Sequence, residues 1–121
     1  MDNKKTLVLG ASENPSRYSN MAIHRLKSKG HDVAAIGRRV GNVEGVEIVK
    51  DKPQYEDVHT VTMYMNAQSQ KEFEDYILSL KPKRIIFNPG AENTFLAEKA
   101  VLNGIEPVEA CTLVMLSTGQ Y

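Results

Sequence analysis

Short apolar runs alternate along this chain with segments of helical hydrophobic period, and this alternation constrains the fold more than any other feature. Each run is mostly apolar and spans only five to eight residues. That length is too short for a buried helix and is typical of a strand covered on both faces of a sheet. The runs cover residues 6–10, 32–37, 58–65, 84–88 and 105–111.

Helical signals fill the stretches between these runs. The predicted helices cover residues 19–29, 73–80, 94–103 and 112–116. Ser19 and Asn93 are the expected N-terminal caps of the first and third helices, and Gly30 and Gly104 are their stop signals. Apolar side chains at helical spacing mark the buried faces of the second and third helices. These are Phe73, Tyr76, Ile77, Leu80, Leu96, Ala97, Ala100 and Val101.

Residues 41–53 depart from the pattern because they are rich in glycine and charge. We interpret them as a loop with one small strand in place of a full helix. Elsewhere, strand and helix alternate at a spacing that requires right-handed parallel crossovers. The sequence therefore predicts an α/β, Rossmann-like, doubly wound three-layer fold with a five-stranded parallel sheet.

Length and charge restrict the classes of protein to which the chain can belong. A chain of 121 residues suits one domain over residues 1–121. With 15 basic and 15 acidic side chains it lacks the basic excess of a general nucleic-acid binder. No apolar stretch is long enough to span a membrane. The single cysteine excludes an internal disulfide framework, so we expect a cytoplasmic protein.

The loop after the first strand has the chemistry of a phosphate-binding turn. In an open parallel sheet, ligands bind outside the carboxyl ends of the strands, where the strand order reverses. Gly10 lets the backbone turn, and the amides of Ala11 and Ser12, with the start of the next helix, can point at an anion. The loop lacks the full glycine-rich dinucleotide motif, because Ser12 and Pro15 stand within it. A strand-to-helix turn without a ligand is the alternative.

The loop after the second strand carries two cations. A domain that binds NAD usually has a carboxylate here to hold the ribose hydroxyls, but this chain has Arg38 and Arg39. A guanidinium makes paired, charge-assisted hydrogen bonds with a phosphate. The pair favours a ligand with a phosphate on its ribose, such as NADP or coenzyme A. Two solvated surface arginines are the alternative.

Four segments together resemble a known family. They are Gly10-Ala-Ser12, Pro15-x-Arg17-Tyr18-Ser19, Asn88-Pro-Gly-Ala-Glu-Asn93 and Ala110-Cys-Thr-Leu-Val-Met-Leu116. The chain is similar to the small CoA-binding domain proteins, stand-alone relatives of the CoA-binding domain in the α subunit of succinyl-CoA synthetase. The resemblance implies a Rossmann-like sheet and coenzyme A or an acyl-CoA as the ligand. The sequence departs from many relatives at Gly37-Arg-Arg39, where those relatives have an Asn-Pro pair.

The resemblance also implies which residues would contact each part of the ligand. It implies that the pyrophosphate lies along Gly10, Ala11 and Ser12, with Arg17 and Tyr18 beside it. It implies that the adenosine and its 3′-phosphate lie near Gly37, Arg38 and Arg39. It implies that Met65 and Asn66 lie along the adenine or the pantetheine, and that the pantetheine arm runs over Asn88, Pro89 and Gly90.

No catalytic set accompanies these candidates. None of His24, His31 and His59 follows the carboxyl end of a predicted strand, and the three are too scattered to hold a metal. Cys111 has no neighbouring base or cation in the sequence. We therefore expect a binding module without catalysis of its own. The alternatives are a small NADP-binding oxidoreductase or redox sensor, and an interaction protein that forms a homodimer through residues 112–116.

Overall fold

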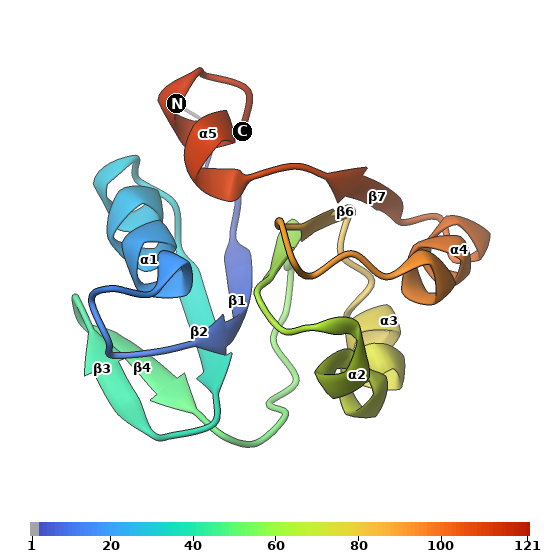
Figure 1. Ribbon diagram of the computed structural model, residues 1–121, viewed down its shortest axis with the longest axis horizontal. Coiled ribbons are helices and arrows are strands. Elements are labelled where there is room, and N and C mark those ends of the chain that lie inside the picture. Colours follow the sequence, from blue (N-terminus) through green and yellow to red (C-terminus); the bar gives the residue numbers. More distant parts are fainter. Residues whose placement is uncertain (1–2) are drawn as a thin grey trace.

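The computed structural model describes residues 3–121, so the first two residues of the predicted domain lie outside it. Its strands are β1 (Thr6–Ala11), β2 (Val33–Gly37), β3 (Gly41–Val43), β4 (Val46–Val49), β5 (Thr60–Met63), β6 (Arg84–Phe87) and β7 (Glu106–Glu109). Its helices are α1 (Tyr18–Ser28), α2 (Ala67–Gln70), the 3₁₀ turn η1 (Lys71–Phe73), α3 (Glu74–Leu80), α4 (Thr94–Leu102) and α5 (Thr112–Ser117). Figure 1 shows these elements around one twisted sheet.

The sheet of residues 3–121 has seven strands in the order β3-β4-β2-β1-β5-β6-β7. All neighbouring strands pair in parallel except β3 and β4, which are antiparallel. The prediction of five parallel strands was therefore wrong in number and in direction at one edge. The six parallel strands follow the order in which a Rossmann fold arranges its strands. The order reverses between β1 and β5, which places the expected ligand edge at the ends of these two strands.

A β-hairpin supplies the two additional strands. Residues 41–53 were predicted to be a loop with one small strand, but β3 and β4 pair through a two-residue turn at Glu44 and Gly45. Both turn residues have positive φ, 53° and 82°, which matches the twist of a tight hairpin. Val46 and Ile48 are buried while Glu47 is exposed. The alternation of these three side chains lets β4 extend the sheet beside β2.

Both faces of the sheet are covered, which explains the continuous apolar runs. Leu7 and Leu9 of β1 point into a core shared with α3 and α4. Val8, between them, points into a second core shared with α1 and α5. Successive side chains of a strand point to opposite faces. A central strand that is covered on both faces is therefore apolar at consecutive positions and does not alternate between apolar and polar residues.

The helices confirm part of the predicted boundaries. Asn93 caps α4, because its side-chain oxygen accepts a hydrogen bond from the Leu96 amide at 3.1 Å. Ser19 was wrong as a cap: α1 begins one residue earlier, and Ser19 is buried inside its first turn. Val101 was also wrong as a buried position, since it is exposed on the outer side of α4. Among residues 3–121, no helix is long and apolar enough to cross a membrane.

Two histidines near the amino ends of the strands make stability depend on pH. The Nδ1 atom of His31 accepts a hydrogen bond from the Lys4 amide at 2.9 Å, so this nitrogen carries no proton. Burial lowers the pKa of His31 below its usual 6.5, and the charges of Lys4 and Arg84 lower it further. Burial, followed by the charge of Arg84, lowers the pKa of His59 in the same direction.

We expect the free energy of unfolding to fall as the pH decreases below about 6.5. Below this pH the two histidines bind protons more readily in the unfolded chain than in the folded chain, because folding lowers their pKa values. A decrease in pH therefore favours unfolding. Urea titrations between about pH 7 and pH 5 measure the slope, and the double variant His31→Asn, His59→Asn should flatten it. A slope unchanged in the double variant would contradict this assignment.

Candidate functional site

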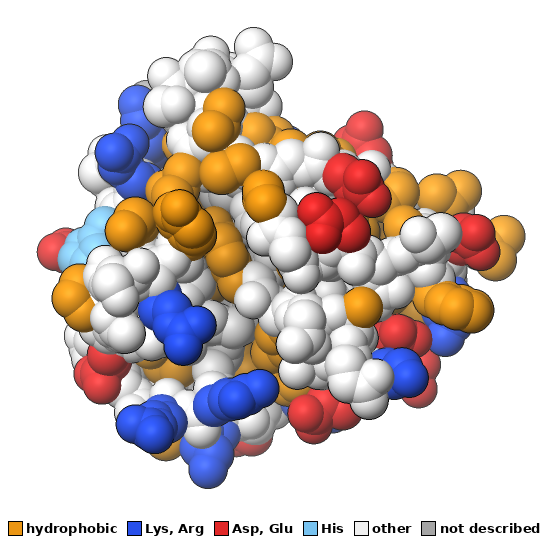
Figure 2. Space-filling view, viewed as in Figure 1, with side chains coloured by type: hydrophobic (Ala, Val, Ile, Leu, Met, Phe, Trp, Pro, Cys, Tyr) orange, Lys and Arg blue, Asp and Glu red, His pale blue; other side chains and the backbone are white. Residues whose placement is uncertain are grey.

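The candidate site lies at the carboxyl edge of the sheet, where β1 stands between β2 and β5. Ligands of open α/β sheets bind at such a reversal of strand order. Figure 2 shows Lys and Arg side chains gathered around the lower end of α1, the end of β2 and the β3–β4 hairpin. Hydrophobic side chains gather between α1 and α5 on the same face. This face therefore has a cationic region near the end of β2 and an apolar region between α1 and α5.

Gly10, near the end of β1, lies against the backbone of the residues that follow β5. Its φ is +95°, which is a conformation that side chains with a Cβ rarely adopt. A Cβ at this position would lie 3.1 Å from the carbonyl carbon of Tyr64. The Tyr64 amide donates a hydrogen bond to the Leu9 carbonyl at 2.8 Å. Both the backbone angle and the narrow space require glycine at this turn.

Gly37 allows β2 to approach β1 at the same edge. A Cβ on Gly37 would lie only 2.3 Å from the carbonyl oxygen of Ala11 and 3.0 Å from Cγ2 of Ile48. Ala11 pairs with Gly37 across a register shift that follows Leu9. The sequence suggested Gly37 only as a neighbour of the adenosine. The structure gives it a packing role that depends on its lack of a side chain.

The loop between β1 and α1 is shaped by its own polar side chains. The hydroxyl oxygen of Ser12 accepts a hydrogen bond from the Asn14 amide at 3.0 Å, and Oδ1 of Asn14 accepts one from the Ser16 amide at 3.0 Å. The side chain of Asn20, on α1, donates to the Ser12 carbonyl at 3.0 Å. Arg17 and Tyr18 are exposed at the end of this loop. The loop is thus ordered by local bonds while its outer side stays open.

Glu13 ties this loop to the hairpin. Its carboxylate accepts a hydrogen bond from the Asn42 amide at 2.9 Å, and its side chain packs against Gly41. Glu13 could not be predicted as a site residue, because nothing near it in sequence indicates contact with residues about 30 positions away. The hairpin therefore supports the predicted phosphate loop from the side.

Arg38 and Arg39 directly follow the close contact between Gly37 and Ala11. Both side chains are exposed, and neither forms an ion pair in the part of the chain from residue 3 onward. A shallow hollow of about 330 Å³ begins at the next residue in the chain, Val40, and is also lined by Glu47, Val49, Lys50 and Asp51. The two guanidinium groups are thus available to an anion beside a partly apolar surface.

The structure places the remaining predicted residues in two loops that follow β5 and β6. Met65 is half-buried and Asn66 is exposed after β5. The side-chain oxygen of Asn66 caps α2 by accepting from the Ser69 amide at 2.9 Å. Pro89 and Gly90 are exposed after β6. The Gly90 amide is already bonded to the Glu92 carboxylate at 3.0 Å, so this amide is not free for a ligand.

Asn88 is 2% exposed and its side chain is fully engaged within the protein. Its Nδ2 donates to Thr62 Oγ1 and to the Met63 carbonyl, both at 2.8 Å. Its Oδ1 accepts from the Thr112 amide at 2.8 Å. The side chain therefore connects β5, β6 and the start of α5. Only the backbone at Asn88 remains for the pantetheine contact that the resemblance implied.

Tyr64 is a further polar residue at this edge that the sequence analysis did not select. Burial raises its pKa to about 12, so the phenol is neutral at physiological pH. Its hydroxyl is buried without a hydrogen-bond partner. The hydroxyls of Thr62 and Thr112 lie beside it but bond to each other at 2.7 Å. The predicted strand, residues 58–65, included Tyr64, so only the observed end of β5 at Met63 places it at this edge.

Two further observations concern a metal site and a second hollow. Within residues 3–121, no three His, Cys, Asp or Glu side chains lie close enough to hold a metal ion. A larger hollow of about 640 Å³ lies at the opposite, amino-terminal edge, where Lys5, Glu56, His59 and Lys83 are among its lining residues. We favour the carboxyl edge because parallel sheets bind ligands there.

Comparison with known proteins gives one family match. The model of a family described as "CoA binding domain" matches residues 4–117. No curated protein has a matching sequence.

Solved structures share the fold. A crystal structure described as that of an uncharacterized protein is 53% identical, covers 100% of both chains and superimposes with a TM-score of 0.97. A hypothetical protein from Pyrococcus horikoshii OT3 is 20% identical with a TM-score of 0.87, over 96% of this chain and 83% of that one. A Thermus thermophilus protein is 20% identical with a TM-score of 0.83, over 98% and 91%. At 20% identity, the last two show the fold alone.

Proposed function

Because this chain belongs to the CoA binding domain family, we propose that it is a binding module for coenzyme A or an acyl-CoA at the carboxyl edge of its sheet. The observation that carries this proposal is the pair Arg38 and Arg39, exposed and without ion-pair partners among residues 3–121, beside the tight Gly37 contact. Coenzyme A has a 3′-phosphate on its ribose as well as a pyrophosphate. Two free guanidinium groups suit the first of these, and a glycine turn suits the second.

Each part of the ligand has a proposed place. The pyrophosphate lies along Gly10, Ala11 and Ser12, with Arg17 and Tyr18 at its side. The 3′-phosphate lies at Arg38 and Arg39, and the adenine packs in the adjacent hollow against Val40 and Val49. The pantetheine arm runs past Met65 and Asn66 to Pro89 and Gly90. Two features support this path: the outer side of the loop after β1 is open, and Asn66, Pro89 and Gly90 are exposed.

Replacement of both arginines should weaken binding strongly. In the double variant Arg38→Ala, Arg39→Ala we expect the affinity for coenzyme A, measured by isothermal titration, to fall by about tenfold or more. A charge-assisted hydrogen bond contributes about 1.5–3 kcal/mol, and about 1.4 kcal/mol corresponds to tenfold in affinity. The double variant Lys27→Ala, Lys29→Ala is the matched control. It removes the same charge at the other end of α1 and should bind as the wild type does.

Titration of the wild type with coenzyme A, NADP and NAD separates the candidate functions. Submillimolar binding of coenzyme A alone supports the proposal. Binding of NADP without coenzyme A would overturn it in favour of the nicotinamide alternative. A folded protein that binds none of the three below millimolar concentration would instead favour an interaction protein.

A further inference from the structure

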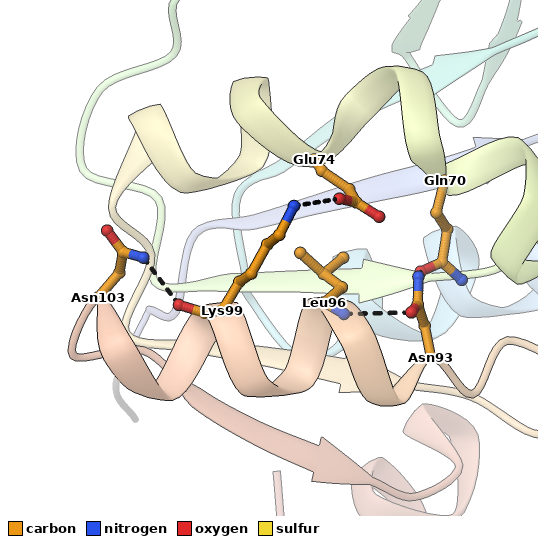
Figure 3. A network of polar contacts seen from close by, with 6 residues as sticks. All are labelled: Gln70, Glu74, Asn93, Leu96, Lys99 and Asn103. Atoms are coloured by element: carbon orange, nitrogen blue, oxygen red, sulfur yellow. Dashed lines mark hydrogen bonds and ion pairs between the residues drawn. The ribbon is translucent and has the colours of Figure 1, made fainter.

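Gln70, like Asn88, is a buried side chain near the candidate site whose polar atoms are all hydrogen-bonded within the protein. It lies at the end of α2 and is 0% exposed. Its Nε2 donates to the carbonyl oxygens of Met65 and Ala91, both at 2.8 Å. Its Oε1 accepts from Nδ2 of Asn93 at 2.8 Å. Figure 3 shows the Gln70 and Asn93 side chains facing each other.

These bonds join the two loops that follow β5 and β6. Met65 belongs to the first loop, and Ala91 and Asn93 belong to the second. Because one amide nitrogen donates to a carbonyl of each loop, the loops cannot separate without loss of a buried hydrogen bond. Leaving a buried polar group without a hydrogen-bond partner destabilises the folded state. Gln70 therefore fixes the spacing between the two loops.

The helices on either side hold this arrangement in place. Asn93 caps α4 through the Leu96 amide. One turn further along α4, Lys99 bonds to Glu74 of α3 at 3.0 Å. Figure 3 shows this ion pair spanning the two helices beside Gln70. This ion pair links α3, which precedes β6, to α4, which follows it. Gln70 bonds to the loops that lead into both helical segments.

We infer that Gln70 is a positioning residue that sets the preference of the site for coenzyme A over nucleotides that lack the pantetheine arm. This inference rests on the proposed function, in which the same two loops receive the arm. A buried glutamine with three partners in two loops specifies one geometry, whereas an apolar side chain would only fill the space. The phosphate and adenosine subsites depend on other elements, β1, β2 and the hairpin, so Gln70 acts on one end of the ligand only.

The test compares two ligands in three proteins. Coenzyme A and 3′,5′-ADP, which ends before the pantetheine, are titrated into the wild type, Gln70→Met and Gln68→Met. Methionine keeps the length of glutamine without its hydrogen bonds, and Gln68 is an exposed residue of the same helix. We expect Gln70→Met to lose about tenfold in affinity for coenzyme A, about 1.4 kcal/mol. Its affinity for 3′,5′-ADP and both affinities of Gln68→Met should stay at the wild-type values.

Each other outcome has a definite meaning. If Gln70→Met weakens both ligands equally, or neither, the inference is wrong. If Gln70→Met does not fold, Asn93→Asp replaces it, because aspartate keeps the oxygen that caps α4 and loses the donor to Gln70. A wild type that binds 3′,5′-ADP and coenzyme A with equal affinity would overturn the inference alone. A wild type that binds neither ligand would overturn the proposed function as well.

Discussion

We expect the Asn88→Ala variant to lose about 3 kcal/mol or more of its free energy of unfolding. The substitution removes three hydrogen bonds from a side chain that is 2% exposed. The Thr112 amide then loses its side-chain partner, and an unsatisfied buried group costs about 1–3 kcal/mol. The Met63 carbonyl keeps the longer hydrogen bond from the Asn88 backbone amide, at 3.4 Å. The Thr62 hydroxyl keeps its hydrogen bond to the Thr112 hydroxyl, so losing its bond to Asn88 adds less to the total cost. Urea denaturation of both proteins measures the difference.

The matched control for this prediction is Asn103→Ala. Asn103 also forms a side-chain hydrogen bond, to the Lys99 carbonyl at 2.7 Å, but it is exposed at the end of α4, where water replaces the lost partner. Its substitution should cost about 0.5 kcal/mol or less. Equal costs at the two positions would show that the Asn88 bonds do not anchor α5 to the sheet.

The Gly37→Ala variant should lose both stability and ligand affinity. A Cβ at this position would lie 2.3 Å from the Ala11 oxygen, and neither strand can yield without a shift of its backbone. Overpacking of this kind costs about 1–3 kcal/mol. The shift would move Ala11, which is part of the proposed pyrophosphate loop. We therefore also expect about a tenfold loss in affinity for coenzyme A by isothermal titration.

Gly30→Ala separates the steric effect from the general cost of removing a glycine. Gly30 has a φ of +86°, and a Cβ added to it would meet nothing within 4 Å, so its substitution carries only a backbone cost, about 1–2 kcal/mol. It follows α1 at the amino-terminal edge, away from the candidate site. We expect it to be destabilised and to bind coenzyme A as tightly as the wild type. Wild-type affinity in Gly37→Ala would refute the role given to the close contact.

The sequence predicted elements best where the signal lies within one segment. Five of the parallel strands were found, because a run such as residues 6–10 must be buried on both faces. The cap at Asn93 was found from the type of residue and its position before an apolar period. The hairpin was missed because its turn, Glu44-Gly45, lacks the usual Asn-Gly or Asp-Gly signature. Its strands, with three and four residues, are also too short to show a clear period.

The candidate site divides in the same way. Gly10, Arg38 and Arg39 could be selected because each lies at or just after the end of a recognisable strand. Glu13 and Gln70 could not, because their partners Asn42, Ala91 and Asn93 lie 21 to 29 residues away. The predicted ligand contact of Asn88 followed from its place after β6, whereas the bonds of its side-chain amide to Thr62, Met63 and Thr112 could be seen only in the structure.

The amino-acid order alone was enough to predict the α/β class and the cationic character of the loop after β2. Those properties follow from local periodicity and from the residues that end each strand. Only the tertiary structure shows that Gly37 packs against the Ala11 carbonyl and that Gln70 bonds to the loops after β5 and β6. Such contacts depend on strand register and on packing between distant segments, and no short window of sequence contains that information.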